Sequence, residues 1–475
     1  MGLSVGEETR FGMNHAAEEG PKERRKNVIW FISDQHRGQA MGIHGDPNVS
    51  TPNMDWLART GCDFEMAYSG MPLCSPFRGS MLTSRYPHHC VPGHEYPLDP
   101  KLPTVASVFR EHGYETLYLG KWHLDGFHES EGRAAFHLIP KERRGGFEKW
   151  LGYENNNSPW DSYVHGDMGE GEVMKKLEGY ETDALTALLL QYLDEDRERP
   201  FFAVISVQPP HDPFIAPPEF MGGRSRGSVE FRQNVPSLQK VRDRAAEDLA
   251  GYYGMIENVD WNLGRVIRKL RDRKLLEQTH VMYFSDHGDM MGSHGQFRKM
   301  TPYEEAVRIP FLIGGEIPMD YGTRGCKAVK RVMINHVDIA PTTLGLCGIE
   351  KPDWMEGFDY SFCRLNRSET HDDIPDSVYL QSVAPNGGPD SVDQPWRGIV
   401  TMDGWKYVRF HGMPWLLYHL TEDPLEEVNL AHNGEISGKT SGAGGTAPGV
   451  GGKDRGFREL PHCKRGKSMI YFGDN

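Results

Sequence analysis

Four short apolar runs, each followed at once by polar residues, limit what this 475-residue chain can fold into. The runs are residues 27–33, 116–119, 201–207 and 280–285. Short continuous apolar runs are typical of strands buried on both faces, as in a parallel sheet covered by helices. Helical patterns separate them, at residues 51–60, 103–112, 181–194 and 243–275. The alternation predicts an α/β fold with a large sheet flanked by helices.

Residues able to do chemistry follow each of these predicted strands. In an open α/β sheet, ligands bind just beyond the carboxyl ends of the strands. The residues at these four ends are Asp34, Gln35, Lys121, His123, His211, Asp286 and His287. A single loop histidine is more often structural than functional. Four such strand ends in one chain nevertheless predict that these side chains converge on one site.

Residues 71–85 combine a candidate nucleophile with a backbone suited to anions. Ser75 is expected to cap a helix, and Pro76 suits the first turn. Cys74 would then lie just before the helix, where free N–H groups and the helix dipole favour an anion. Arg78 adds a fixed cation on the first turn. A cysteine before a helix is usually only a buried thiol, so the other motifs have to support a catalytic role.

Charge and cysteine content exclude several classes of protein. The net charge of −14 argues against a general nucleic-acid binder and against a protein that binds anionic membranes. The seven cysteines are scattered and include no Cys-x-x-Cys pair, so neither a disulfide framework nor a structural zinc site is predicted. No window has the length and apolar character of a membrane span.

The amino-terminal residues 1–26 are polar and lack the apolar run of a signal peptide. As the sequence stands, this predicts a cytoplasmic protein. Removal of a leader from the sequence would make it periplasmic or secreted instead.

The segment Cys74-x-Pro76-x-Arg78, followed by Leu82-Thr83-x-Arg85, resembles the signature of the type I sulfatases. That family usually has Gly where Ser84 stands. Further blocks resemble the same family, in this order: Asp34-Gln35, Gly120-Lys121-Trp122-His123, Asp286-His287, His294-Gly295 with Lys299 and Tyr303-Glu304, and residues 336–349. The resemblance extends from about residue 27 to residue 431.

The resemblance implies an alkaline-phosphatase-like α/β fold with a large mixed sheet. It also implies a small C-terminal α+β subdomain that carries an antiparallel sheet and a helix. We expect a polar extension at 1–26, a catalytic domain at 27–370 and the subdomain at 371–475. Within these, residues 125–180 show no sustained period and are expected to form a surface excursion. Residues 433–455, rich in Gly, Ser and Thr, are expected to form a flexible loop.

The same resemblance implies a divalent-metal site whose ligands are Asp34, Gln35, Cys74, Asp286 and His287. Calcium is the usual family metal and suits oxygen ligands. The histidine and the glutamine depart from the common family pattern, so manganese and magnesium stay open. Cys74 would be oxidised by a maturation enzyme to formylglycine, an aldehyde whose hydrate attacks sulfate esters.

The catalytic residues implied are Cys74, Arg78, Lys121, His123, His211 and Lys299. Arg78, Lys121 and Lys299 would neutralise the sulfate. His211 or Lys299 would protonate the leaving alkoxide, and His123 would act as the base that allows sulfate to leave. The expected reaction is hydrolysis of a sulfate monoester, with a sulfated carbohydrate as the default substrate.

Two alternatives remain beside the sulfatase. One is a phosphonate or phosphate ester hydrolase of the same superfamily; the presence of both Lys121 and His123 argues against it. The other is a non-catalytic protein that binds a sulfated glycan, although the nucleophile and metal ligands are all present. Candidate sugar contacts are His94, Glu95, Trp160, His165 and Asp212.

Overall fold

The computed structural model describes residues 25–316, 332–365, 373–385, 390 and 392–432. Almost all of the predicted polar extension and the whole predicted loop at 433–455 lie outside these residues. Within the described part, no helix is both long and apolar enough to cross a membrane.

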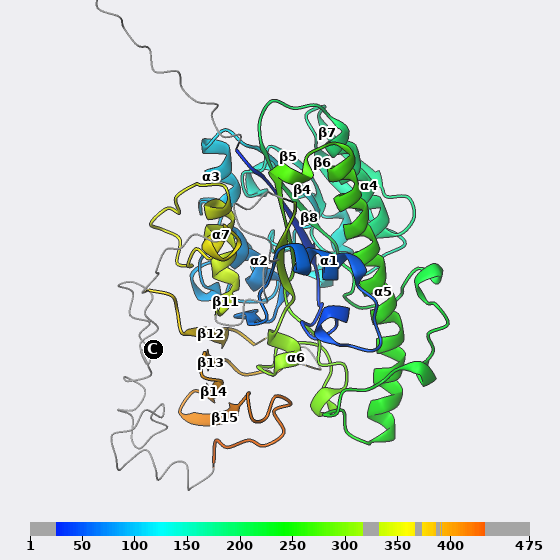
Figure 1. Cartoon of the computed structure of the whole chain (residues 1–475), viewed down its shortest axis with the longest axis vertical. Helices are drawn as coiled ribbons and strands as arrows, with labels where there is room; N and C mark the ends of the chain where they lie inside the picture. The colour runs from blue at the N-terminus through cyan, green and yellow to red at the C-terminus, as the bar shows by residue number, and fades with distance from the viewer. Residues whose placement is uncertain (1–24, 317–331, 366–372, 386–389, 391, 433–475) are drawn as a thin grey trace, which may run out of the picture.

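A nine-stranded mixed sheet forms the centre of the protein (Figure 1). Its strands are β1 (Asn27–Ser33), β2 (Cys62–Asp63), β4 (Glu115–Lys121), β5 (Lys149–Tyr153), β6 (Tyr163–Asp167), β7 (Glu172–Lys176), β8 (Phe201–Ser206), β9 (Thr279–Ser285) and β10 (Phe311–Gly314). Their order is β2-β10-β9-β1-β8-β4-β5-β6-β7. The four strands predicted from the sequence are neighbours, and they run parallel as β9-β1-β8-β4. The predicted α/β fold is confirmed.

Strand β1 lies in the middle of the sheet because its side chains are apolar on both faces. Val28, Trp30 and Ile32 pack on one side, with α2 (Cys74–Thr83), α3 (Val105–Glu111) and α7 (Ile339–Leu346). Ile29 and Phe31 pack on the other, with α1 (Pro52–Thr60), α4 (Glu181–Asp194) and α5 (Gln239–Asp272). Figure 1 shows the two helical layers on either side of the sheet.

The predicted surface excursion at 125–180 is partly wrong, because it contains three strands of the main sheet. Strand β5 is parallel to β4, and β6 and β7 continue the sheet in antiparallel fashion. All five residues of β7 are exposed. An exposed edge strand is held by backbone pairing and not by apolar burial, so it leaves no periodic apolar signal in the sequence.

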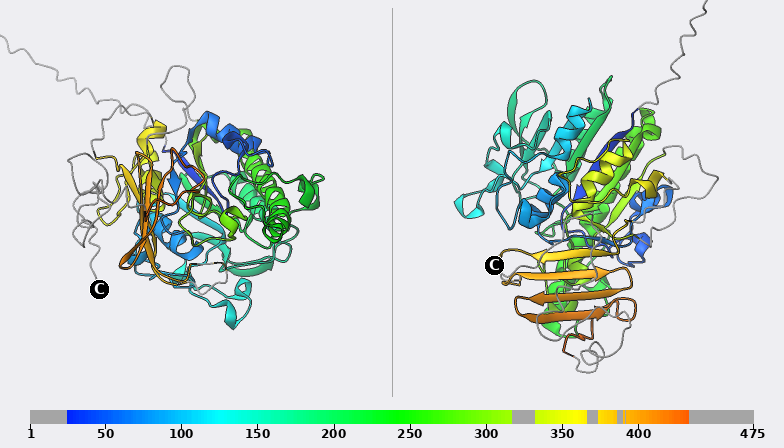
Figure 2. Two further views of the ribbon diagram at one scale, coloured as in Figure 1. Left: turned by 90° about the horizontal axis from the view of Figure 1, so that it is seen from below. Right: turned by 90° about the vertical axis from the view of Figure 1, so that its left-hand side faces the viewer.

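A second, smaller sheet lies below the main domain in the right-hand view of Figure 2. It consists of β12 (Ser377–Ser382), β13 (Trp396–Thr401), β14 (Trp405–Phe410) and β15 (Met413–His419), all antiparallel. The predicted antiparallel sheet is confirmed. The helix expected with it is not found among the described residues from 377 to 432.

Lys406 of β14 joins this second sheet to the main domain. Its Nζ lies 2.7 Å from a carboxylate oxygen of Glu304 and 2.7 Å from one of Glu426, and all three side chains are buried. Burial raises the pKa of Glu426 to about 7, against the opposing effect of Lys406. The lysine therefore compensates both buried carboxylates, and Arg308 adds a second cation to Glu304 at 2.9 Å.

We expect Lys406→Met to destabilise the protein by about 3–5 kcal/mol, because it leaves the buried carboxyl group of Glu426 without its paired cation, whereas Glu304 retains Arg308. The measurement is the free energy of urea-induced unfolding. Lys176→Met is the control, since its pair with Asp161 is exposed to solvent and its loss should change stability little. Equal unfolding midpoints for the two variants would contradict this role of Lys406.

Candidate active site

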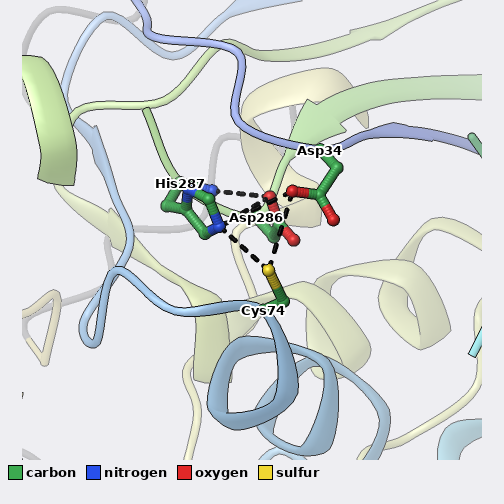
Figure 3. Close-up of side chains that lie close together, drawn as sticks. All are labelled: Asp34, Cys74, Asp286 and His287. Carbon is green, nitrogen blue, oxygen red and sulfur yellow. Dashed lines mark hydrogen bonds and ion pairs between the residues drawn. The ribbon is translucent and has the colours of Figure 1, made fainter. Parts of the chain in front are cut away.

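Four buried side chains from distant parts of the chain meet at the carboxyl edge of the main sheet (Figure 3). Asp34 follows β1, Asp286 and His287 follow β9, and Cys74 is the first residue of α2. One candidate ligand atom from each lies within 4.8 Å of all the others. The structure thus brings three of the predicted strand-end residues, Asp34, Asp286 and His287, together with Cys74.

The atoms that face one another are those with ligand chemistry. Cys74 Sγ lies 3.2 Å from Nε2 of His287 and 3.7 Å from Oδ1 of Asp34. The same Nε2 is 3.6 Å from Oδ1 of Asp34 and 3.6 Å from Oδ1 of Asp286. The other ring nitrogen of His287 donates to the carbonyl of Gly288 at 3.0 Å, which fixes the ring and leaves Nε2 free.

Two cations lie on the opposite side of the carboxylates. Lys121 Nζ is 2.8 Å from Oδ2 of Asp34, and Arg78 reaches Oδ2 of Asp34 at 3.2 Å and of Asp286 at 3.4 Å. Burial would raise the pKa of Asp34, but Lys121 and the nearby cations hold it well below its usual value. Burial and the neighbouring Asp34 raise the pKa of Asp286 to about 7.

This donor set suits a divalent cation. Burial, and then the neighbouring Asp34, raise the pKa of Asp286, and a bound cation would offset both effects. An oriented imidazole nitrogen and the side chain of residue 74 complete a four-donor group. Two carboxylates favour calcium, magnesium or manganese, whereas the imidazole also suits softer ions.

The helix that carries Cys74 begins two residues earlier than predicted. Leu73, in extended conformation, is the N-cap, so Cys74 and Ser75 both lie inside α2 and Ser75 does not cap it. Pro76 still falls in the first turn, where a missing N–H is tolerated. Burial and Asp34 would raise the pKa of the Cys74 thiol, but Lys121 and Lys299 outweigh them and lower it to about 7.

Lys299 and His211 close the site on the solvent side. Lys299 Nζ is 3.5 Å from Cys74 Sγ, and it donates to Nε2 of His211 and to Oε1 of Gln35, each at 2.8 Å. The Gln35 amide nitrogen donates to Asp289 at 2.8 Å and to Asp212 at 3.2 Å. The side chain of Gln35, predicted as a metal ligand, is thus hydrogen-bonded to Lys299 and to two carboxylates.

His123 lies in a left-handed turn, with φ of 55°, just after β4. Burial, together with Lys121, holds its pKa well below the usual value of 6.5. Its imidazole is therefore neutral at neutral pH and able to accept a proton.

We expect His123→Ala to lower kcat on a sulfate ester about 10²-fold, because a positioned base is lost. The wild-type kcat should be measured between about pH 5 and 8. Because the pKa of His123 is low, we expect no loss of kcat with a midpoint near 6.5 as the pH falls. His112→Ala, at the exposed end of α3, serves as the control. A transition near 6.5 that His123→Ala removes would contradict the low pKa.

Two residues of the site escaped the sequence analysis. Ser206 ends β8, and its Oγ accepts a hydrogen bond from Arg78 at 2.8 Å, which fixes the guanidinium. Asp289 holds the Gln35 amide and also accepts two backbone N–H groups. Ser206 occupies the last position of a predicted strand, so the rule that ligands bind at strand ends could have found it.

The candidate sugar contacts separate into two groups. His94 contacts His123 edge to face at 5.2 Å between ring centroids, and Asp212 lies beside Gln35, so both border the site. His165, in contrast, is buried in β6 and accepts the backbone N–H of Ile139 at 2.8 Å. In the structure His165 is therefore part of the scaffold.

A second group with metal-ligand chemistry, His294, Glu305 and Glu426, lies at the contact with the small sheet. Its carboxylates already pair with Arg232 and Lys406, at 3.0 Å and 2.7 Å. His294 contacts the amide nitrogen of Asn234 through Nε2 at 3.3 Å. Because its charges are compensated by protein cations, we assign this group a structural role.

An α/β fold that gathers a nucleophile, carboxylates and cations at the carboxyl edge of its sheet is typical of hydrolases of anionic esters. The model of the sulfatase family matches residues 26–349, and that of the C-terminal part of N-sulphoglucosamine sulphohydrolase matches residues 292–439. The chain therefore belongs to the sulfatase family and is a hydrolase of sulfuric esters.

Individual relatives agree with this family. An ulvan-active sulfatase of Formosa agariphila is 34% identical, over 87% of this chain and 78% of its own. An N-acetylglucosamine-6-O-sulfatase of Bacteroides thetaiotaomicron is 24% identical, over 88% and 84%. A solved structure of a protein proposed to be the sulfatase yidJ of Bacteroides fragilis is 26% identical and superimposes with a TM-score of 0.75, covering 87% of this chain and 93% of its own.

Proposed function

We propose that this sulfatase hydrolyses a sulfate monoester of a carbohydrate. The reaction would use one divalent cation, for which we propose calcium, and a formylglycine made from Cys74. The observation that carries the proposal is the position of Cys74, whose Sγ lies within 3.7 Å of the carboxylate, imidazole and ammonium groups of Asp34, His287 and Lys299. The two relatives named for ulvan and N-acetylglucosamine sulfate support a carbohydrate substrate.

Asp34, Asp286, His287 and residue 74 would hold the cation, and Gln35 would complete the set if its amide turned away from Lys299. When bound, the cation would supply Lewis-acid stabilisation of sulfate oxygens. Formylglycine would supply an oxygen nucleophile once hydrated.

The remaining residues neutralise the charge of the ester and transfer protons. Lys299 contacts residue 74, and Arg78 and Lys121 contact the neighbouring Asp34, so these three cations can neutralise the negative charge of the ester. Lys299 or His211, which share a hydrogen bond at the open side, can protonate the oxygen of the leaving alcohol. His123, neutral and buried, takes a proton from residue 74 so that sulfate can leave.

Two measurements test the proposal. Mass spectrometry of the tryptic peptide that contains Cys74 should show an aldehyde in place of the thiol when the host has the maturation enzyme. Parallel assays with an aryl sulfate and phenyl phosphonate should show faster hydrolysis of the sulfate. Faster hydrolysis of phenyl phosphonate would instead favour the phosphonate or phosphate ester hydrolase, and turnover of neither would favour a glycan-binding protein.

A further inference from the structure

Buried polar atoms without a hydrogen-bond partner gather beside the active site. Among the described residues, they include Nδ1 of His94, Oδ1 of Asn155 and Oε1 of Gln208. Asn155 is 6% exposed and Gln208 is 2% exposed. A buried acceptor left without a donor costs about 1–3 kcal/mol, so such atoms indicate a place where a ligand supplies the donor.

These atoms belong to one hydrogen-bonded row of side chains. Glu95 accepts the backbone N–H of Glu129 at 3.0 Å, and the Glu129 carboxylate accepts the side-chain amides of Asn155 and Asn157. Asn157 in turn accepts from Gln208 Nε2 at 3.1 Å. We name the row of His94, Glu95, Glu129, Asn155, Asn157 and Gln208 the polar arc.

Both ends of the polar arc adjoin catalytic residues. At one end the ring of His94 packs against His123, with centroids 5.2 Å apart. At the other end the carbonyl of Gln208 accepts the backbone N–H of His211 at 3.0 Å. Asn155 follows β5 and Gln208 follows β8, the strands on either side of β4, so the arc lies at the same sheet edge as the site.

We infer that the polar arc binds the hydroxyl groups of an uncharged sugar ring that carries the sulfate, an inference that rests on the proposed sulfatase function. The unpartnered amide oxygens need hydrogen-bond donors, which hydroxyl groups supply and a sulfate does not. Glu95 and Glu129 add two carboxylates to the same row. A second sulfate or a carboxylate on that ring would therefore be repelled.

Asn157→Ala tests the hydroxyl contacts, because Asn157 is exposed and links the two halves of the arc. Probes are methyl glucoside and methyl galactoside monosulfates, compared with 4-nitrophenyl sulfate, which has no hydroxyl group. We expect kcat/KM to fall about tenfold or more on the sugar sulfate, mainly through KM, and to stay unchanged on 4-nitrophenyl sulfate. Asn48→Ala, outside the arc, is the matched control.

Glu129→Gln tests the charge of the arc, since it keeps an acceptor oxygen for the two asparagines. We expect the ratio of kcat/KM for a disulfated sugar to that for the monosulfated sugar to rise about tenfold or more. An unchanged ratio, or an equal loss with 4-nitrophenyl sulfate in Asn157→Ala, overturns the inference.

Binding separates this inference from the proposed reaction. In a Cys74→Ala background, calorimetry should show methyl glycoside monosulfates binding about tenfold more weakly when Asn157→Ala is added. That result, together with no turnover by wild-type protein in which Cys74 carries the aldehyde, would leave the arc standing and refute the reaction. Hydrolysis of 4-nitrophenyl sulfate without binding of any sugar sulfate would refute the arc alone.

Discussion

Cys74→Ala should abolish hydrolysis of sulfate esters, with a loss of about 10⁴-fold or more in kcat. The side chain of residue 74 is the group that Asp34, His287 and Lys299 jointly surround, and alanine removes any precursor of the nucleophile. Alanine is also the best helix former, so α2 should persist. The measurements are kcat on an aryl sulfate and circular dichroism of the folded variant.

The control for this substitution is Cys347→Ala, which removes a free thiol from a position outside the site. It should retain wild-type activity. If the Cys74→Ala variant hydrolysed sulfate esters at the wild-type rate, the mechanism would be refuted, whatever the metal content of the protein.

Asp286→Asn should lower kcat on the order of 10³-fold or more, through loss of the bound divalent cation. The substitution removes one of two carboxylates from the donor group yet keeps an oxygen that can accept the backbone N–H groups of Gln35 and His287. Metal analysis of the purified protein should show about one ion per chain in the wild type and much less in the variant. The same analysis distinguishes calcium from manganese and magnesium.

Thermal stability provides a second readout for the cation. Ligand at about 100 times its Kd stabilises the folded state by about 2.7 kcal/mol, so added metal should raise the Tm of the wild type but not of Asp286→Asn. Asp260→Asn is the control, because Asp260 is a buried carboxylate that accepts backbone N–H groups of α1 instead. A metal-dependent Tm in Asp286→Asn protein would argue against the assigned ligand.

The sequence alone predicted the parts of the fold that depend on burial. The central residues of β1, β4, β8 and β9 are mostly apolar, because helices cover both faces of the sheet there. Strand β7 was missed because it is the exposed edge strand, held mainly by backbone pairing with β6. The start of α2 was misplaced because Ser75 favours a cap locally, whereas Leu73 has the N-cap position in the structure.

The site was predictable to the extent that it lies at strand ends. Asp34, Lys121, Asp286 and His287 follow or end apolar runs, and the sheet topology then brings them together. The polar arc was not predictable in the same way. Glu129 lies in a short 3-10 helix within a segment that lacks periodicity, and only the folded structure shows that its carboxylate meets Asn157 and, through it, Gln208.

The central position of β1 affects how this chain can be made. Its apolar residues leave the ribosome well before either partner strand: Ser33 pairs with Ser285, and Val28 with Phe202. At about 5–20 residues per second, synthesis of the roughly 250 residues up to β9 takes on the order of ten to fifty seconds. During that time the apolar strand β1 lacks at least one of its two partner strands. Efficient production of this protein should therefore depend on cellular chaperones that shield nascent chains.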